Sequence, residues 1–153
     1  MSGLQVLLGG VRGSRTVSAG TIRQYGGDTT SILIRDESSN VIVDAGSGLR
    51  RIVDELLPQV DNKRLLVLIT HYHLDHVQGL SALYDLFRTG WNVRIAAPPC
   101  EQRPATEVLR AMMEPPFFPI SIESRNIEER PNPRADRTQD TLLDHEGFAI
   151  RAF

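Results

Sequence analysis

A run of five apolar residues, LLVLI at 65–69, leads directly into a segment that holds three of the chain's four histidines. A strand that is apolar at every position is typical of the middle of a sheet, where both faces are covered. The polar segment THYHLDH at 70–76 therefore starts at the carboxyl end of a predicted central strand. Functional sites of α/β folds form at this edge of the sheet. One stretch of sequence thus predicts the centre of the fold and the place of its site.

The rest of the chain alternates between strand and helix patterns. Short β-branched or leucine-rich runs between turn residues predict further strands at 5–9, 31–35, 40–46, 92–97 and 148–153. Apolar residues at helical spacing predict helices over 49–56, 80–87 and 105–112. We interpret segment 123–140, rich in arginine, acid and proline, as a solvated loop. This alternation predicts an α/β fold.

Composition excludes several classes of protein. A chain of 153 residues, with 41% hydrophobic and 24% charged residues, has the size and composition of one globular domain. The net charge of -2 gives no electrostatic reason to bind nucleic acid or an anionic membrane. No apolar stretch reaches the roughly 20 residues of a membrane span. The single cysteine, Cys100, fits a reducing compartment, so we expect a cytoplasmic protein without a membrane partner.

The histidine cluster has the residue types and spacing of a metal site. Side chains at i and i+2 of an extended segment share a side, so His71 and His73 can face one point above the sheet edge. Asp75 and His76 follow where the chain turns into a helix, and they can hold a second metal. Imidazole and carboxylate ligands suit zinc, iron or manganese. The alternative is a polar loop with exposed histidines, but the concentration of three in one place favours metal.

Several segments resemble one family of proteins. THYHLDH resembles the H-x-H-x-D-H signature of the metallo-β-lactamase-fold hydrolases. VIVDAGSGLR at 41–50 resembles that family's second motif, in which a strand ends in an aspartate and a glycine turn, here Asp44 and Gly46. GGVRGS at 9–14 and YGGDTTSILI at 25–34 resemble the opening of its ribonuclease Z-like and phosphodiesterase-like branch. The resemblance extends over essentially the whole chain.

The resemblance implies a four-layer αββα sandwich that binds two divalent metal ions, zinc first, with iron or manganese as alternatives. His71 and His73 would bind the first metal. Asp75 and His76 would bind the second, with Asp75 as a catalytic residue. Asp44 would hydrogen-bond a ligand histidine and fix its tautomer. Substrate-binding residues are not identified.

The family's third histidine, bridging aspartate and last histidine have no match in this sequence. We interpret the remaining histidine, His145, as an exposed hairpin residue rather than a ligand. Residues 1–153 are therefore expected to be the N-terminal part of one such domain, about its first half to two-thirds, inactive alone and with a bare inner sheet face. The alternative is a natural half-domain that binds a partner or completes its site by association, for example as a homo-oligomer.

The implied function is hydrolysis by a hydroxide that two metals share. The branch suggests a phosphodiesterase, so the expected substrate is a small-molecule ester or phosphodiester. Arg12, Arg15 and Arg23 could steer a phosphate by bidentate hydrogen bonds. The acidic balance argues against a nucleic-acid substrate. The competing function is a non-catalytic half-domain.

Overall fold

The structure is a computed structural model that describes residues 3–18, 24–59, 61–118, 126–129, 142–145 and 148–151. The strands are β1 (Gln5–Gly10), β2 (Ser31–Arg35), β3 (Asn40–Val43), β4 (Arg64–Leu68), β5 (Asn92–Ala97), β6 (Ile127–Glu129), β7 (Leu142–His145) and β8 (Phe148–Arg151). The helices are α1 (Leu49–Leu56), α2 (Leu74–Val77), the 3-10 helix η1 (Leu80–Ala82), α3 (Leu83–Arg88) and α4 (Ala105–Met112). None of the helices in these ranges combines the length and the apolar composition that crossing a bilayer requires.

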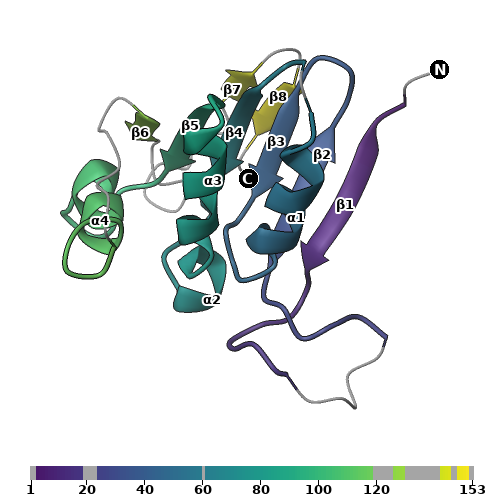
Figure 1. Ribbon diagram of the computed structural model, residues 1–153. Coiled ribbons are helices and arrows are strands. Elements are labelled where there is room, and N and C mark those ends of the chain that lie inside the picture. The colour runs from purple at the N-terminus through teal and green to yellow at the C-terminus, as the bar shows by residue number, and fades with distance from the viewer. Residues whose placement is uncertain are drawn as a thin grey trace.

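Strands β1 to β6 form one sheet in chain order. The pairs β1–β2 and β2–β3 are antiparallel, whereas β3 to β6 run parallel, with helices between β3, β4 and β5. Helices α1 and α3 cover one face of this sheet (Figure 1). Strand β4 lies between β3 and β5, and residues 65–67 are at most 1% exposed. The predicted central strand and the α/β fold are confirmed.

The face under the helices carries the main core. Leu33, Ile42, Val67 and Ile95 are partners in successive strands, so they lie side by side across the sheet, and all four are fully buried. Helix α1 packs the stripe predicted from its spacing onto this face: Leu49, Ile52, Val53 and Leu56. Burial of several aliphatic side chains, each worth about 1.5–3 kcal/mol, holds helix and sheet together.

The opposite face of the sheet is apolar but only partly covered. Val41, Leu66 and Ala96 form a small second cluster there, each at most 2% exposed. Exposure rises toward β1, where Val6 is 59% and Leu8 is 52% exposed. Val6 pairs with Ile34 and Leu8 with Ile32, which places all four on this face. We call these four residues of β1 and β2 the open face.

One prediction about secondary structure needs refinement and another is wrong. The helix predicted over 80–87 is present as the 3-10 helix η1 followed directly by α3, and the separate helix α2 precedes it from Leu74. Gly79 lies between α2 and η1, and its backbone N–H donates outside the helices, to Ala45 O at 2.8 Å. The loop predicted over 123–140 contains β6, whose Ile127 pairs with Ile95 and is 8% exposed. A single apolar residue in this strand left no pattern to recognise.

The other predicted strands and helices agree with the observed elements to within a few residues, whereas β7 was not predicted. Strands β3 and β4 are shorter than predicted at their carboxyl ends, and the last two residues predicted for β8 lie outside the described part of the chain. Residues 119–125 and 130–141 lie outside the described part of the chain. His145 ends β7 and pairs with Phe148 of β8, so its backbone is at the turn of a hairpin. The structure does not describe the side chain of His145, so the exposure predicted for this residue stays a prediction.

Candidate metal centre

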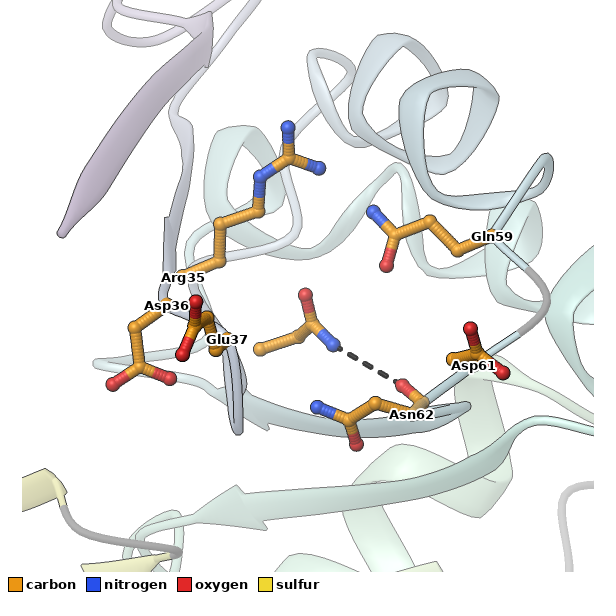
Figure 2. Close-up of a pocket in the computed structure, with 7 residues that line it drawn as sticks. Arg35, Asp36, Glu37, Gln59, Asp61 and Asn62 are labelled. Carbon is orange, nitrogen blue, oxygen red and sulfur yellow. Dashed lines mark hydrogen bonds between the residues drawn. The ribbon is translucent and has the colours of Figure 1, made fainter. Parts of the chain in front are cut away.

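Polar residues gather at both ends of the sheet. At the amino ends of β3 and β4 a pocket of about 390 Å3 has a polar lining, shown in Figure 2. The lining residues are Arg35, Asp36, Glu37, Asn40, Gln59, Asp61 and Asn62. The hydrogen bond drawn there joins Asn40 Nδ2 to Asn62 O at 3.4 Å. None of the predicted site residues lines this pocket.

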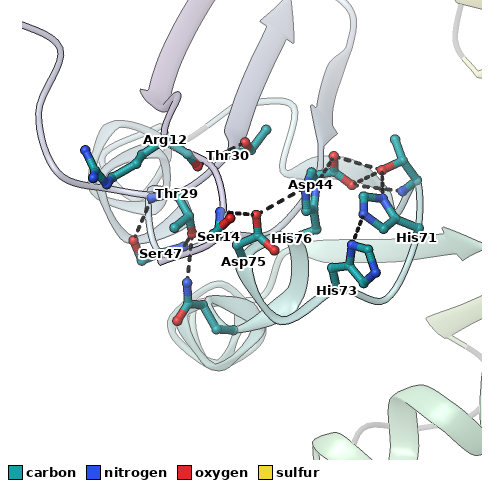
Figure 3. A network of polar contacts seen from close by, with 12 residues as sticks. Arg12, Ser14, Thr29, Thr30, Asp44, Ser47, His71, His73, Asp75 and His76 are labelled. Atoms are coloured by element: carbon teal, nitrogen blue, oxygen red, sulfur yellow. Dashed lines mark hydrogen bonds and ion pairs between the residues drawn. The ribbon is translucent and has the colours of Figure 1, made fainter. Parts of the chain in front are cut away.

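The predicted site residues all lie at the opposite end, where β3 and β4 finish (Figure 3). Asp44 follows β3 directly, His71 and His73 are in the extended segment after β4, and Asp75 and His76 are on α2. Because β3 and β4 are parallel, their carboxyl ends meet at one edge of the sheet. The fold thereby brings together residues that are up to 32 positions apart.

Asp44 is at the centre of the cluster. It is 3% exposed, and its backbone has a left-handed φ of 60°. Thr70 donates to Asp44 Oδ1 from its backbone N at 2.8 Å and from its hydroxyl at 2.9 Å. His76 Nδ1 lies 2.7 Å from Asp44 Oδ2. Since a carboxylate only accepts, His76 carries a proton on Nδ1 and, when neutral, a lone pair on Nε2.

Through Thr70, Asp44 also fixes the tautomer of a second histidine, His71. Its hydroxyl has one proton, which is directed at Asp44, so it accepts a hydrogen bond from His71 Nδ1 at 2.9 Å. His71 therefore carries its own proton on Nδ1 and, when neutral, its lone pair on Nε2. One carboxylate thus sets the tautomers of two imidazoles, one directly and one through Thr70.

His71 and His73 face each other. His71 Nε2 lies 3.0 Å from His73 Nδ1, and the rings meet edge-on. Tyr72, between them, points elsewhere: it packs against the main core and donates to Pro98 O at 2.5 Å. Burial, followed by the neighbouring His76 and His73, lowers the pKa of His71. The neutral ring, the form that binds metal, is thereby favoured.

Asp75 and His76 form a second pair. Asp75 Oδ2 lies 3.5 Å from His76 Nε2, the nitrogen that carries the lone pair. The backbone N–H of Ser14 donates to the same oxygen at 2.7 Å, and this hydrogen bond is the main cause of a lowered pKa of Asp75. The rings of His71 and His76 are 4.1 Å apart between centroids, so the two pairs are neighbours.

The loops that carry the cluster pack backbone against backbone. A Cβ on Gly79 would lie 2.0 Å from Gly46 O, so a side chain at that position has no room. Thr29 Oγ1 accepts from Ser47 N at 2.8 Å and from Gln78 Nε2 at 2.9 Å, which ties the same loops to the start of β2 (Figure 3). The cluster therefore rests on a fixed backbone.

The geometry offers two incomplete sets of metal ligands. Among the described residues, no group of three or more His, Cys, Asp or Glu side chains could hold a metal ion. What the cluster offers is one pair of nitrogens, from His71 and His73, beside one nitrogen and one oxygen, from His76 and Asp75. Each pair can supply two ligands, and a metal in either place needs further ligands from water or from other residues.

Sequence reasoning missed Ser14, and the suggested role of the arginines stays a prediction. Ser14 reaches Asp75 through its backbone, and no residue type encodes such a contact. Arg12, one of the arginines that could steer phosphate, donates from Nε to Arg15 O at 3.1 Å, and its side chain points away from the histidines (Figure 3). Arg23 lies outside the described residues.

An apolar groove of about 540 Å3 lies beside the cluster, between α2 and α4. Leu74, which separates His73 from Asp75, is 66% exposed and belongs to its wall. Phe117 contributes an 80% exposed aromatic ring on the other side. A molecule held at the metal ligands would therefore have an apolar surface next to it.

Comparison with known proteins identifies the family. The family model of the metallo-beta-lactamase superfamily matches residues 25–148. No curated protein sequence matches significantly. Among solved structures, the chain resembles a diphosphatase from the PhnP family, with a TM-score of 0.58 and 15% identity over 95% of this chain and 55% of that one. It also resembles the metallo-beta-lactamase SMB-1 in a complex with mercaptoacetic acid, with a TM-score of 0.50 and 19% identity over 82% of this chain and 46% of that one.

The chain thus spans about half the length of the structures that it resembles. At such low identity these likenesses concern the fold. The family model matches most of the chain, including Asp44 and the whole histidine segment. The chain belongs to the metallo-beta-lactamase superfamily.

Proposed function

We propose that this chain supplies the first ligands of a dinuclear metal centre in a metal-dependent hydrolase. His71 Nε2 and His73 Nδ1 would hold one metal, and Asp75 Oδ2 and His76 Nε2 would hold the other. The observation that carries the proposal is the orientation of the imidazoles. Asp44 leaves Nε2 of both His71 and His76 with a lone pair, and those are the atoms that face the other member of each pair.

The donor atoms fit divalent metals of the zinc type. Neighbouring nitrogen ligands of a tetrahedral zinc, bound at about 2.0–2.1 Å, are about 3.3 Å apart. The two pairs have separations of 3.0 Å and 3.5 Å. Imidazole with carboxylate suits zinc first and iron or manganese next. Bound there, the metals would supply a nucleophilic water near neutral pH and polarise the bond to be cut.

The residues of the chain have distinct parts in this proposal. Asp75 is proposed as a catalytic residue, since it is the carboxylate in the cluster whose oxygen faces a lone-pair nitrogen, that of His76. Asp44 and Thr70 would act through the histidines by fixing their tautomers, not by touching the substrate. The apolar groove would receive a part of the substrate beside the reacting bond.

The substrate class is proposed as a phosphodiester or another small-molecule ester. The sequence resembles the phosphodiesterase-like branch of the family, and one similar structure is a diphosphatase. Both involve cleavage of a phosphorus–oxygen bond. The single cysteine supports a reducing compartment such as the cytoplasm.

We further propose that residues 1–153 are the N-terminal part of a longer αββα domain. The open face is the structural support: four aliphatic residues on two neighbouring strands are exposed or half-buried, and a second sheet packed on them would bury them. The related structures have about twice the length that this chain spans. The same exposed face would also suit the competing function, a half-domain that associates with a partner.

The open face can be tested with a substitution whose effect differs between the two contexts. In the 153-residue chain, Leu8→Lys is expected to leave the unfolding free energy within about 0.5 kcal/mol and to reduce self-association. In the longer domain the same change would bury an unpaired charge and lower the unfolding free energy by several kcal/mol. Equal, small effects in both would contradict the proposed second sheet.

The hydrolase proposal is tested with the longer protein and bis(p-nitrophenyl) phosphate in the presence of Zn2+ or Mn2+. We expect turnover that is abolished in His71→Ala/His73→Ala and retained in His145→Ala. The 153-residue chain alone should be inactive. Absence of turnover with this ester, together with turnover of a thioester or a β-lactam, would reject the phosphodiester class. Turnover that survives the double substitution would reject the assigned ligands.

A further inference from the structure

The glycine-rich stretch before β2 contains a tight turn that reaches into the cluster. Arg15 N donates to Gly13 O at 2.9 Å, a hydrogen bond between residues i+2 and i, and Ser14 in the middle has a φ of 68°. This is a three-residue γ-turn of the rare kind, with a left-handed central residue. Such a conformation is unfavourable for any residue except glycine, and strained residues of this type cluster at functional sites.

The turn is fixed to the sheet on its amino-terminal side. Arg12 N donates to Asp28 O at 3.0 Å, in the loop that leads into β2. Thr30 Oγ1 lies 3.5 Å from Arg12 O, and Arg12 Nε closes the turn on Arg15 O at 3.1 Å. The position of the Ser14 amide is therefore set by the loop before β2.

The amide of Ser14 has one partner of consequence. Its N–H donates to Asp75 Oδ2 at 2.7 Å, across 61 positions of sequence. The same oxygen lies 3.5 Å from His76 Nε2 (Figure 3). A carboxylate oxygen has two lone pairs. One can accept the proton of the Ser14 amide, and the other remains for the proposed second metal beside His76 Nε2.

We propose that the backbone amide of Ser14 is a positioning group for Asp75, holding Oδ2 in place beside His76 Nε2 for the second metal. The inference rests on the proposed metal centre and adds to it a third segment of the chain. Asp75 is only 9% exposed. A carboxylate that lost the Ser14 N–H would therefore have little water available to replace that hydrogen bond. The first metal pair, His71 and His73, has no contact with this turn among the hydrogen bonds of the described residues.

The function of this turn also accounts for its conformation. The direction of an amide follows from the dihedral angles around it, and here the left-handed residue is the one whose N–H faces Asp75. The side chain of Ser14 is exposed. Burial of that side chain therefore does not explain the strained conformation. The hydrogen bond from the Ser14 amide to Asp75 does.

Three variants of Ser14 in the longer protein test the proposal. Ser14→Pro removes the N–H, and its ring cannot adopt a positive φ. Ser14→Val keeps the N–H but disfavours the left-handed conformation, because its side chain is β-branched. Ser14→Gly keeps the N–H and relaxes the strain, so it is the conservative variant. Co2+ binding is followed by its visible absorption and by calorimetry, and the unfolding transition of the metal-free protein is recorded for each variant.

The expected result is a selective effect on one of two metals. Ser14→Pro should bind the second Co2+ about 10- to 100-fold more weakly while the first binds as in the parent protein, and Ser14→Gly should bind both. Ser14→Val should fall between them. Retention of the first Co2+ also reports a folded protein. If Ser14→Pro does not fold, the comparison of Val with Gly decides.

Other results would overturn the role of the amide or reject the metal centre. Parent-like binding of the second Co2+ by Ser14→Pro and Ser14→Val would overturn the role of the amide. Equal weakening of both metals in these variants would also overturn it, since the turn would then have only a structural role. A parent protein that binds no Co2+, or binds it unchanged in His71→Ala/His73→Ala, would instead reject the metal centre itself.

Discussion

Two aspartates follow the carboxyl ends of neighbouring strands, and they have different roles. Asp36 follows β2 and Asp44 follows β3, and because these strands are antiparallel the two residues lie at opposite ends of the sheet. Asp36 is exposed, and its Oδ1 accepts three hydrogen bonds from Ser38 and Ser39, at 2.8–2.9 Å. Asp44 is buried, and its donors are 26 and 32 residues away.

The comparison shows what distinguishes a candidate site from a turn. Both carboxylates accept a backbone N–H and a hydroxyl, so neither residue type nor bonding pattern separates them. Asp36 closes a local turn that the next three residues can form alone. Asp44 joins the end of β3 to Thr70 and to α2, and so it fixes the side chains of two further residues. The range of its contacts distinguishes the end of the sheet that carries the proposed metal centre.

The largest loss of stability is expected for Asp44→Ala. It leaves the Thr70 donors and His76 Nδ1 without their acceptor in a partly buried place, so the unfolding free energy should fall by about 2–4 kcal/mol. Urea denaturation of the metal-free protein measures this. A loss of unfolding free energy below about 0.5 kcal/mol is the size expected for an ordinary surface substitution. Such a result would mean that Asp44 stabilises the fold no more than the local turn residue Asp36 does.

Asp44→Asn separates stability from metal binding. The amide keeps the shape and tolerates a positive φ, so we expect a smaller loss of stability than in Asp44→Ala. Its NH2 group would face His76 Nδ1 and favour the tautomer with the proton on Nε2, the atom proposed as ligand. Zinc affinity should therefore fall about 10- to 100-fold in a calorimetric titration. Parent-like affinity would show that the tautomer is not set by Asp44.

Thr70 allows one branch of the Asp44 network to be cut. Thr70→Val keeps the branched shape but loses the hydroxyl between Asp44 and His71, and about 1 kcal/mol of stability should be lost. Metal affinity at the His71–His73 pair should decrease, with the Asp75–His76 pair less affected. Thr70→Ser retains the hydroxyl and is the matched control. Equal metal binding by the Val and Ser variants would exclude a role for the hydroxyl.

The smallest effect is expected for Asp36→Ala, and it should depend on pH. Hydrogen bonds from Ser38 lower the pKa of Asp36 in the folded protein. The stabilisation is thus present above the ordinary aspartate pKa of about 3.9 and is lost as pH falls through the lower folded value. The difference in melting temperature between the parent and Asp36→Ala should be small at pH 7 and vanish in acid. Metal binding should be unchanged at every pH.

The sequence predicts the part of this molecule that follows from periodicity and spacing. The apolar run at 65–69 and the stripe on α1 identify the central strand and its covering helix, because burial imposes those patterns. The extended segment after β4 places His71 and His73 on one side, because side chains two residues apart in an extended backbone share a side. The tautomers that result from Asp44 and Thr70 depend on contacts between distant segments, and only the folded structure shows them.

What the sequence could not predict involves backbone contacts and weak patterns. The Ser14 amide carries no signature, since any residue has an N–H. Strand β6 has one buried apolar residue, Ile127, and it is held by pairing with β5 rather than by its own propensity. The break between α2 and η1 lies at Gly79, which packs closely against Gly46, a residue 33 positions earlier in the chain. In each case tertiary structure decided.

The most direct test of the central claim is the metal content per chain of the purified longer protein, by elemental analysis, beside the His71→Ala/His73→Ala variant and the 153-residue chain. We expect about two metals per chain in the parent, fewer than one in the double variant, and substoichiometric metal in the 153-residue chain. A parent protein without metal, or one whose metal content is the same after the double substitution, would contradict the assignment of this cluster as a metal centre.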